Sequence, residues 1–462
     1  MRGAGITDAV AGLREALGPD RVLAGADIPA RNHADASGLD PTPPAALVLP
    51  RSTEEVSAAL KICHAHRRPV VTQGGLTGLA GGAHPKGNEI ALSLERMSGV
   101  EEVDAASGTL TALAGTPLHV VQGAAEEAGF LCGIDLGARG SCSIGGNIAT
   151  NAGGNQVLRY GMARRNVLSL EVVLADGRIV RSLNKMLKNN AGYDWAQLFI
   201  GSEGTLGVVT RVVLGLHPKP EGVETALCAV ESFPDAVRLL RALERALPGG
   251  LLVFEAMWRE LMDAAVERGG LRAPFAAPHE ICLLVEAATG GRGAEAFESA
   301  LAPLLEEGVV SDAIVAQSRA DRDRLWAYRE SPYEYPRWLP KQVGFDISIP
   351  LARMGDAVDA LRADLLGHWP EAFHVYFGHV ADSNIHVIVA TPGMTDADKR
   401  AVEHVVYDRV SACGGSISAE HGIGRNKRAF LHLSRTEPEL ALMATIKGAL
   451  DPAGILNPDR VL

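Results

Sequence analysis

The stretch that most constrains the fold is residues 133–155, GIDLGARGSCSIGGNIATNAGGN, which holds seven glycines among Ser, Thr and Asn. It has neither the apolar period of a helix nor the alternation of a strand, so it predicts a long ordered loop. Glycines permit positive φ and close backbone approach to a ligand, and successive unpaired N–H groups form a concave anion site. A floppy surface loop is the alternative, but linkers seldom keep apolar anchors such as Ile134, Leu136, Ile144 and Ile148. The stretch therefore favours a phosphate-bearing cofactor.

Length and composition limit the classes of protein to which this chain can belong. A chain of 462 residues exceeds the usual size of a single core, which favours two domains. The net charge of −11 argues against nucleic acid and anionic lipid as partners and leaves small molecules. The six cysteines include no C-x-x-C pair, so neither a disulfide framework nor a cysteine zinc site is indicated. The N-terminus lacks a signal-peptide core, and no later apolar run is long enough to span a membrane, which together predict a soluble, cytoplasmic protein.

Residues 1–220 are expected to form the first domain. Two further glycine-rich segments lie in it, at 73–82 and 201–210. The first follows a strand–helix–strand pattern, but it comes after the second strand of its unit, which excludes a nicotinamide-type G-x-G-x-x-G fingerprint. Ser52 or Thr53 would cap the second helix, with Glu55 in a capping box. Helices are predicted at 6–17, 53–67 and 118–128, and strands at 46–49, 69–72, 90–94, 108–114, 167–174, 179–182 and 208–214.

The two prolines of His217–Pro220 end this domain, because they interrupt both helix and sheet. Residues 221–410 then alternate between helical and strand patterns and are expected to form a second domain. Residues 411–462 form a C-terminal segment. Helices are predicted at 234–247, 293–305 and 351–365, and strands at 251–255, 280–286, 374–377 and 386–390.

Residues 374–389 predict a hairpin that carries two histidines. If Asp382 and Ser383 are the two central turn residues, His379 faces His386 across the hairpin with Cβ atoms about 5 Å apart. Two imidazoles this close can share one metal ion, and Glu420 offers a third ligand. Two His and one carboxylate suit catalytic zinc, although Fe(II) or Mn(II) could use the same donors. The alternative is that either histidine simply pairs with a backbone carbonyl.

Four motifs make the chain resemble the vanillyl-alcohol-oxidase family of flavoproteins. They are PRSTEEV, GGLTGLAGG, SIGGNIATNAGG and GSEGTLGVVT. The similarity is to the branch that contains a flavin-binding component of glycolate oxidase together with D-2-hydroxyglutarate dehydrogenase and D-lactate dehydrogenase, and it spans nearly the whole chain. It implies an α+β fold, with a two-part FAD-binding domain and a cap domain built on an antiparallel sheet. It also implies that residues 411–462 return to the flavin domain.

The resemblance places FAD on the three glycine-rich segments. The pyrophosphate is expected on residues 73–82 and the ring system near residues 133–154 and 203–208. Leu76 stands where relatives with covalently bound flavin often carry His, so dissociable FAD is expected. Asn457 matches a C-terminal motif that reaches the flavin, although a Pro-terminated tail is the alternative. The implied cofactor residues are Pro69, Gln73, Gly74, Gly75, Leu76, Thr77, Gly78, Gly81, Gly82, Asp135, Gly140, Ser141, Ile144, Gly145, Gly146, Asn147, Thr150, Asn151, Gly153, Gly154, Glu203, Gly204, Gly207, Val208 and Asn457.

The resemblance also implies a reaction on a D-2-hydroxy acid. His379, His386 and Glu420 match its metal ligands, zinc being the expected ion, and the metal would chelate the substrate. His421 would be the general base, and hydride would pass to the flavin. Relatives usually have Gly where this hairpin has Ser383, which weakens an ideal positive-φ turn.

Arg329 matches the family arginine that binds a substrate carboxylate, although a surface ion pair would also explain it. Lys427 matches a family lysine, or is simply solvated. Tyr333 and Gly344 stand where the hydroxyglutarate branch has Thr and Lys, so D-lactate or an aromatic hydroxy acid competes with D-2-hydroxyglutarate. The expected substrate-binding residues are Arg329, Tyr333, Asn384 and Lys427.

Two other classes of function compete with this prediction. A zinc metallohydrolase would use the same His and Glu residues, but it leaves the glycine-rich loops without a role and lacks H-E-x-x-H. A non-catalytic flavin-binding component of a glycolate oxidase-type complex is the second alternative. Since no iron–sulfur cysteine cluster is present, an external acceptor is expected, such as electron-transfer flavoprotein, a quinone or a dye. A homodimer is a family-level expectation.

Overall fold

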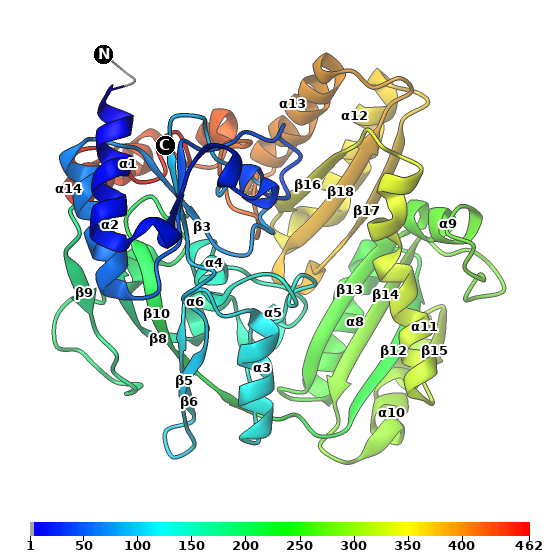
Figure 1. Cartoon of the computed structure of the whole chain (residues 1–462). Helices are drawn as coiled ribbons and strands as arrows, with labels where there is room; N and C mark the ends of the chain where they lie inside the picture. The colour runs from blue at the N-terminus through cyan, green and yellow to red at the C-terminus, as the bar shows by residue number, and fades with distance from the viewer. Residues whose placement is uncertain (1–3) are drawn as a thin grey trace. The chain divides into compact units, whose positions relative to one another are not determined.

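The computed structural model describes residues 4–462, which divide into two compact units. The first contains the chain up to Gly154, residues 160–219 and residues 420–462. The second contains residues 155–159 and 220–419, so it continues past the predicted boundary at residue 410. The prediction of an α+β fold is confirmed, because both units combine helices with sheets (Figure 1).

The first unit is built on two main sheets. One has four strands in the order β1-β2-β4-β3, in which β2, β4 and β3 are parallel. The other has five antiparallel strands in the order β5-β6-β10-β8-β9, and a two-stranded ladder joins β11 to β7. The strands are β1 (Val22–Leu23), β2 (Ala46–Val48), β3 (Val70–Gln73), β4 (Ile90–Ser93), β5 (Val100–Asp104), β6 (Thr109–Leu113), β7 (Phe130–Leu131), β8 (Val167–Val173), β9 (Ile179–Arg181), β10 (Val208–Gly215) and β11 (His217–Pro218).

Helices cover these sheets, and α1 runs beside α2 (Figure 1). Ser52 caps α2 by accepting from the Glu55 N–H, but the Glu55 carboxylate binds the N–H of Arg51. The predicted capping box is therefore wrong, since its return bond would end on Ser52. The helices are α1 (Ala4–Leu17), α2 (Thr53–Ala65), α3 (Leu118–Glu127), α4 (Ile144–Ala149), α6 (Ala163–Asn166), α7 (Ala196–Phe199) and α14 (Glu437–Leu450). Helix α5 (Val157–Tyr160) falls mostly in the second unit.

Helix α4 corrects the prediction that residues 133–155 are all loop. The Ser143 side chain accepts from the Gly146 N–H and caps this six-residue helix. Ile144 and Ile148 lie one helical turn apart and are completely buried in the core of the unit. Burying two such side chains contributes roughly 1.5–3 kcal/mol each. That packing offsets the poor helix propensity of the paired glycines, which conceals the helix in the sequence.

The second unit is one seven-stranded antiparallel sheet with the strand order β15-β12-β14-β13-β17-β18-β16. The predicted antiparallel sheet is thus confirmed, although the strands β12, β15 and β16 were not among the predicted ones. The strands are β12 (Val223–Val230), β13 (Leu251–Trp258), β14 (Ile281–Ala288), β15 (Asp312–Val315), β16 (Val343–Ser348), β17 (Phe373–Gly378) and β18 (Asn384–Ala390). The helices are α8 (Phe233–Ala246), α9 (Arg259–Glu267), α10 (Gly293–Glu306), α11 (Arg319–Glu330), α12 (Met354–His368) and α13 (Asp396–Ala412).

The remaining turns are short 3-10 helices. They are η1 (Pro19–Arg21), η2 (Gly25–Asp27), η3 (Ala30–His33), η4 (Ser331–Arg337), η5 (Leu351–Arg353), η6 (Val380–Asp382) and η7 (Arg428–Leu433). The six cysteines are free thiols, as predicted. Within residues 4–462, no helix combines the length and the apolar character that crossing a membrane would require.

Candidate active site

The glycine-rich segment after β3 approaches the 133–155 stretch very closely. A Cβ on Gly75 would lie 2.1 Å from the Ser141 carbonyl oxygen, and a Cβ on Gly74 would lie 2.4 Å from Ser143 Oγ. The buried Gln73 side chain bonds to Asn32 and to the Ala83 carbonyl and so fixes the start of the segment. Two segments that are far apart in the sequence are thereby brought together, and only glycine fits at their contact.

The third glycine-rich segment, which begins at Gly201, is bound to the C-terminal end of α4. The Gly201 N–H donates to the Ile148 carbonyl at 3.0 Å, and the Glu203 N–H donates to the Ala149 carbonyl at 2.7 Å. All three predicted segments therefore meet at residues 141–151. The sequence indicated that they hold one ligand along its length, and their convergence is the arrangement that such binding requires.

Glu203 holds a fourth segment against this group. Its carboxylate accepts hydrogen bonds from the N–H of Ile423 at 2.7 Å and of Gly424 at 2.8 Å. Gly422 has φ of 78°, and a Cβ there would lie 2.7 Å from the Glu203 Oε1. Burial raises the pKa of the Glu203 carboxyl, and these two bonds only partly offset it. The Glu203 side chain therefore fixes the position of the loop that carries Glu420 and His421.

The C-terminal segment packs into the first unit through Asn457. Its Oδ1 accepts from the Thr72 N–H at 2.9 Å, and its Nδ2 donates to the carbonyls of Gly82 at 3.3 Å and Glu203 at 2.7 Å. The Asn457 N–H also donates to the Val70 carbonyl at 2.8 Å. These bonds exclude the free-tail alternative and fix Asn457 where the glycine-rich segments start.

The residues of this group fit a phosphate-bearing cofactor. Within residues 4–462, the backbone N–H groups of residues 74–78 donate to no protein acceptor. Leu76 lies among them with φ of 61°, and such a sign change turns successive N–H groups toward one point. Asn147 is 2 % exposed, and its Oδ1 has no hydrogen-bond partner among the described residues. The free amides suit a pyrophosphate, and the buried amide oxygen can accept from a ring N–H.

In the second unit, the two hairpin histidines are neighbours, but not through the predicted register. Phe377, not His379, is the Cα partner of His386. The hairpin turns through η6 and then Ser383, whose φ is 74°, so His379 lies in the turn. The ring centroids of His379 and His386 are nevertheless 5.6 Å apart. The predicted nearness of the two histidines is therefore correct. The predicted two-residue turn is wrong, because the 3-10 turn adds residues to the loop.

A buried carboxylate on the interior strand β13 links His379 to Arg329. Glu255 accepts from the His379 Nδ1 through one oxygen and from the Arg329 Nε through the other. Burial by itself raises the pKa of a carboxyl, but the charges of His379 and Arg329 lower the pKa of Glu255 to about 2. Arg329 is 7 % exposed, and its Cζ lies 4.7 Å from the centre of the Phe377 ring. A surface ion pair is therefore excluded as the explanation of Arg329.

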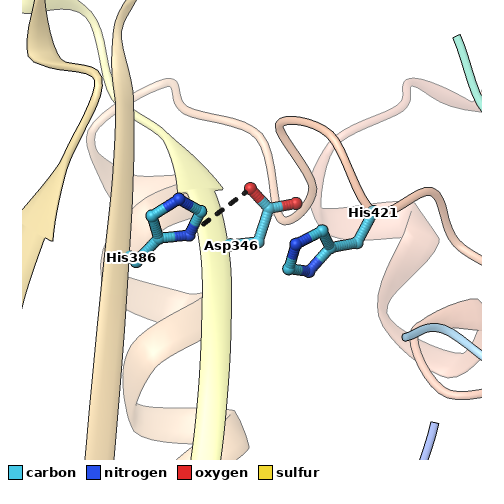
Figure 2. A group of neighbouring side chains, drawn as sticks. All are labelled: Asp346, His386 and His421. Carbon is cyan, nitrogen blue, oxygen red and sulfur yellow. Dashed lines mark ion pairs between the residues drawn. The ribbon is translucent and has the colours of Figure 1, made fainter. Parts of the chain in front are cut away.

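A second buried carboxylate faces His386. Asp346 is the Cα partner of His386 on β16, and its Oδ1 lies 4.0 Å from the His386 Nδ1 (Figure 2). Asn384 Nδ2 donates to the same oxygen at 2.7 Å, and the Ala419 N–H donates to Oδ2 at 3.2 Å. The strand pairing thus places one carboxylate beside each histidine.

The other predicted site residues have different environments. Glu420 accepts from the Gly154 N–H at 2.7 Å, which ties it to the 133–155 stretch. Lys427 is 7 % exposed, so it is not a solvated surface lysine. Asn384 is 3 % exposed, and its Oδ1 has no partner within the described chain. Tyr333 is 71 % exposed, which leaves its predicted contact with substrate without structural support.

Sequence reasoning missed Glu255 and Asp346. Glu255 is 124 positions from His379, and neither carboxylate lies in a motif beside a histidine. A charged residue inside the apolar pattern LLVFEAMW was the one available signal, because a charge in a buried strand needs a partner.

Comparisons with known proteins agree with this geometry. The profile of the "FAD binding domain" family matches residues 44–182, and that of "FAD linked oxidases, C-terminal domain" matches residues 219–461. A bovine mitochondrial D-2-hydroxyglutarate dehydrogenase is 41% identical over 90% of this chain and 76% of its own length. A D-2-hydroxyglutarate dehydrogenase of Xanthomonas citri is 39% identical over 90% of this chain and 89% of its own.

Solved structures share the fold. A substrate-bound p-cresol methylhydroxylase aligns with a TM-score of 0.78 at 17% identity, covering 99% of this chain and 97% of its own. An alkyldihydroxyacetonephosphate synthase aligns with a TM-score of 0.73 at 18% identity, covering 98% of this chain and 85% of its own. The chain belongs to the FAD-linked oxidase family and is a flavin-dependent oxidoreductase.

Proposed function

We propose that the protein oxidises a D-2-hydroxy acid to the 2-oxo acid with FAD as the electron acceptor. The observation that carries this proposal is the 41% identity, over 90% of the chain, to a relative named D-2-hydroxyglutarate dehydrogenase. The cofactor residues expected from the sequence support it, since their three segments meet around residues 141–151 and present unpaired amides. Non-covalent FAD is consistent with Leu76 at the position where a covalent link would need His.

We also propose that His379, His386 and Glu420 hold a divalent cation, with zinc as the expected ion. The 5.6 Å between the two imidazole centroids suits two ligands of one ion. Glu420 directly follows Ala419, whose N–H is bound to the carboxylate beside His386. Treatment with a chelator should remove both the metal and the activity, and the metal that restores activity identifies the ion.

Each predicted site residue has its own role in the oxidation of the hydroxy acid. Bound FAD supplies a two-electron acceptor, and a bound cation would neutralise the charge of the substrate. Arg329 binds the substrate carboxylate, and His421 accepts the hydroxyl proton. The α-carbon loses a hydride and the hydroxyl loses a proton, so the C–O bond becomes C=O. Asn384 and Lys427 orient the acid through the polar atoms they bring to the site.

Replacing His421 with Asn tests the proton transfer. The variant should bind FAD normally but lose flavin reduction by substrate, because the amide cannot accept the proton. The matched control is His432→Asn, since His432 is exposed on η7 and should not matter. Normal flavin reduction by His421→Asn would remove the proposed base.

The identity of the acid follows from a substrate panel. Tyr333 and Gly344 are both exposed, and neither carries a charge for the distal carboxylate of D-2-hydroxyglutarate. D-2-hydroxyglutarate, D-lactate and an aromatic D-2-hydroxy acid should therefore be compared with their L-forms, using a dye acceptor. Oxidation of L-acids alone would overturn the proposal. Absence of a flavin absorption spectrum would favour a metallohydrolase instead.

Electrons must then leave the flavin for an external carrier. We propose electron-transfer flavoprotein or a quinone as the acceptor, and the rate of reoxidation by each distinguishes them. A homodimer is proposed from the family resemblance, and the mass of the purified protein in solution tests it.

A further inference from the structure

We infer that Glu255 is a positioning residue that fixes a metal-binding histidine and the substrate-binding arginine with one carboxylate. The inference deepens the proposed function and rests on it. Its basis is the contact pattern of the second unit, in which one Glu255 oxygen meets His379 Nδ1 and the other meets Arg329 Nε.

The position of Glu255 makes this pairing obligatory. The residue is 1 % exposed on β13, which has sheet partners on both sides. An unpaired carboxylate in such a place is strongly unfavourable, because burial removes the water that would solvate its charge. His379 and Arg329 are therefore held by the same carboxylate, which needs both of them as partners.

The contact with His379 decides which ring nitrogen is available. Because a carboxylate can only accept, Nδ1 must carry the proton and donate to Glu255. Nε2 then carries the lone pair that a cation needs. A carboxylate behind a metal-ligating histidine also fixes the ring orientation and raises the basicity of the ligand. Glu255 would thus prepare His379 before any ion arrives.

The contact with Arg329 ties the anion-binding group to the same point. Its Nε is held by Glu255, and its guanidinium lies over the Phe377 ring with Cζ 4.7 Å from the ring centre. A planar guanidinium held at Nε presents its remaining N–H groups in a fixed direction. The spacing between the metal ligand and the carboxylate-binding group is then set by one side chain.

Glutamine at this position separates the two functions of the carboxylate. An amide has one oxygen for two donors, and the charged Arg329 is the stronger competitor for it. The NH₂ group of Glu255→Gln then faces His379 Nδ1, which must become an acceptor and move its proton to Nε2. The tautomer that binds metal is lost while the side chain keeps its volume.

The neighbouring strand provides a matched control. Glu286 on β14 is 5 % exposed and accepts from Arg322 Nε and Trp326 Nε1 of the same helix, α11. The register pairs Glu255 with Leu284 and Val253 with Glu286, so both glutamates lie on one face of the sheet. Glu286→Gln changes a second buried carboxylate that accepts from an arginine, without touching a histidine.

The experiment compares wild type, Glu255→Gln, Glu255→Asp and Glu286→Gln as full-length proteins with FAD bound. Each is stripped of metal with a chelator and titrated with Zn²⁺ and Co²⁺. We expect Glu255→Gln to bind metal about 10–100-fold more weakly, and Glu286→Gln to stay within about twofold of wild type. Glu255→Gln should also raise the KM for the hydroxy acid. Glu255→Asp keeps the charge but has a shorter side chain, so its metal affinity should lie between that of Glu255→Gln and that of wild type.

A second measurement needs no metal. Proton NMR of the stripped protein should show a downfield imidazole N–H signal from His379, absent in Glu255→Gln and present in Glu286→Gln. Retention of this signal and of metal affinity in Glu255→Gln would overturn the inference, as would an equal loss of both in Glu286→Gln. Wild type that binds no metal but shows the signal would instead overturn the proposed metal site. The Co²⁺ titration and the NMR signal thus separate the two failures.

Discussion

Glu203 in the first unit and Glu255 in the second are both buried carboxylates, but different donors hold them. Glu203 accepts from two backbone N–H groups of the 420–427 segment, whereas Glu255 accepts from two side chains, His379 through Nδ1 and Arg329 through Nε. Burial raises the pKa of Glu203, and the charges around Glu255 overcome burial and lower its pKa to about 2. Bonds from backbone N–H groups fix the position of a loop, whereas bonds from side chains fix the orientation of those side chains.

The largest effect on stability is expected at Asn457, which holds the C-terminal segment of the chain against Glu203. Asn457→Ala removes three side-chain hydrogen bonds and leaves the half-buried N–H of Thr72 without the Asn457 acceptor. At roughly 1 kcal/mol per bond plus the orphaned group, the free energy of unfolding should fall by about 3–5 kcal/mol. Chemical denaturation and the FAD-to-protein absorbance ratio measure it. Asn189→Ala, at an exposed position, is the control, and equal losses in both would contradict the assignment.

The next effect concerns activity. In Gly422→Ala, the new Cβ would lie 2.7 Å from the Glu203 carboxylate at φ of 78°, so the segment carrying Glu420 and His421 must move. A displacement of about 1 Å can cost on the order of 100-fold in kcat. Gly414→Ala is a matched control, because Gly414 has φ of 69° with nothing within 4 Å. Equal rates for the two variants would show that Glu203 does not position the loop.

The pH dependence of stability compares two buried carboxylates of the first unit, Glu171 with side-chain donors and Glu203 with backbone donors. Burial raises the pKa of Glu171 on β8, but hydrogen bonds from Thr53, Thr210 and two arginines outweigh it and lower this pKa. A lowered pKa contributes stability that is present above the unfolded value of roughly 4.3 and is lost as the pH falls.

Glu203 should behave in the opposite way. Its raised pKa means that the folded state keeps a proton that the unfolded chain has released, so its contribution falls as the pH rises above roughly 4.3. Denaturation of wild type, Glu171→Gln and Glu203→Gln from pH 4 to 8 tests both signs. Relative to wild type, the loss in Glu171→Gln should grow with pH, and the loss in Glu203→Gln should shrink. Parallel curves would contradict both assignments.

The smallest effect is expected at the hairpin turn of the second unit. The loop around Glu203 uses glycine at positive φ, whereas this turn uses Ser383 at φ of 74°. A non-glycine residue in the left-handed region costs roughly 1–2 kcal/mol. Glycine avoids this strain, but it loses more backbone entropy on folding, so the net gain is smaller. Ser383→Gly should therefore stabilise the unit by about 0.5–1 kcal/mol in chemical denaturation, and Ser383→Ala should not. Destabilisation by Gly would mean that the hydroxyl matters to the turn.

Much of the local structure could be predicted from the sequence. The strands around residues 70–73, 167–173 and 208–215 are rich in valine and leucine, and their positions were predicted correctly. The nearness of His379 and His386 was also predicted, because a hairpin brings neighbours in the chain together whatever its register. The short helix α4 was missed, since its stability comes from burying Ile144 and Ile148 rather than from propensity.

The sequence by itself indicated a phosphate-bearing cofactor, and its family motifs implied FAD, because glycine-rich segments record local needs of the backbone in local residues. Only the tertiary structure decided which carboxylates stand behind the histidines. Glu255 and Asp346 reach His379 and His386 by strand pairing across the sheet, and sheet order depends on the packing of the whole unit. A partner 124 residues away leaves no spacing signal in the chain, so the charge in a buried strand is visible in the sequence but its partner is not.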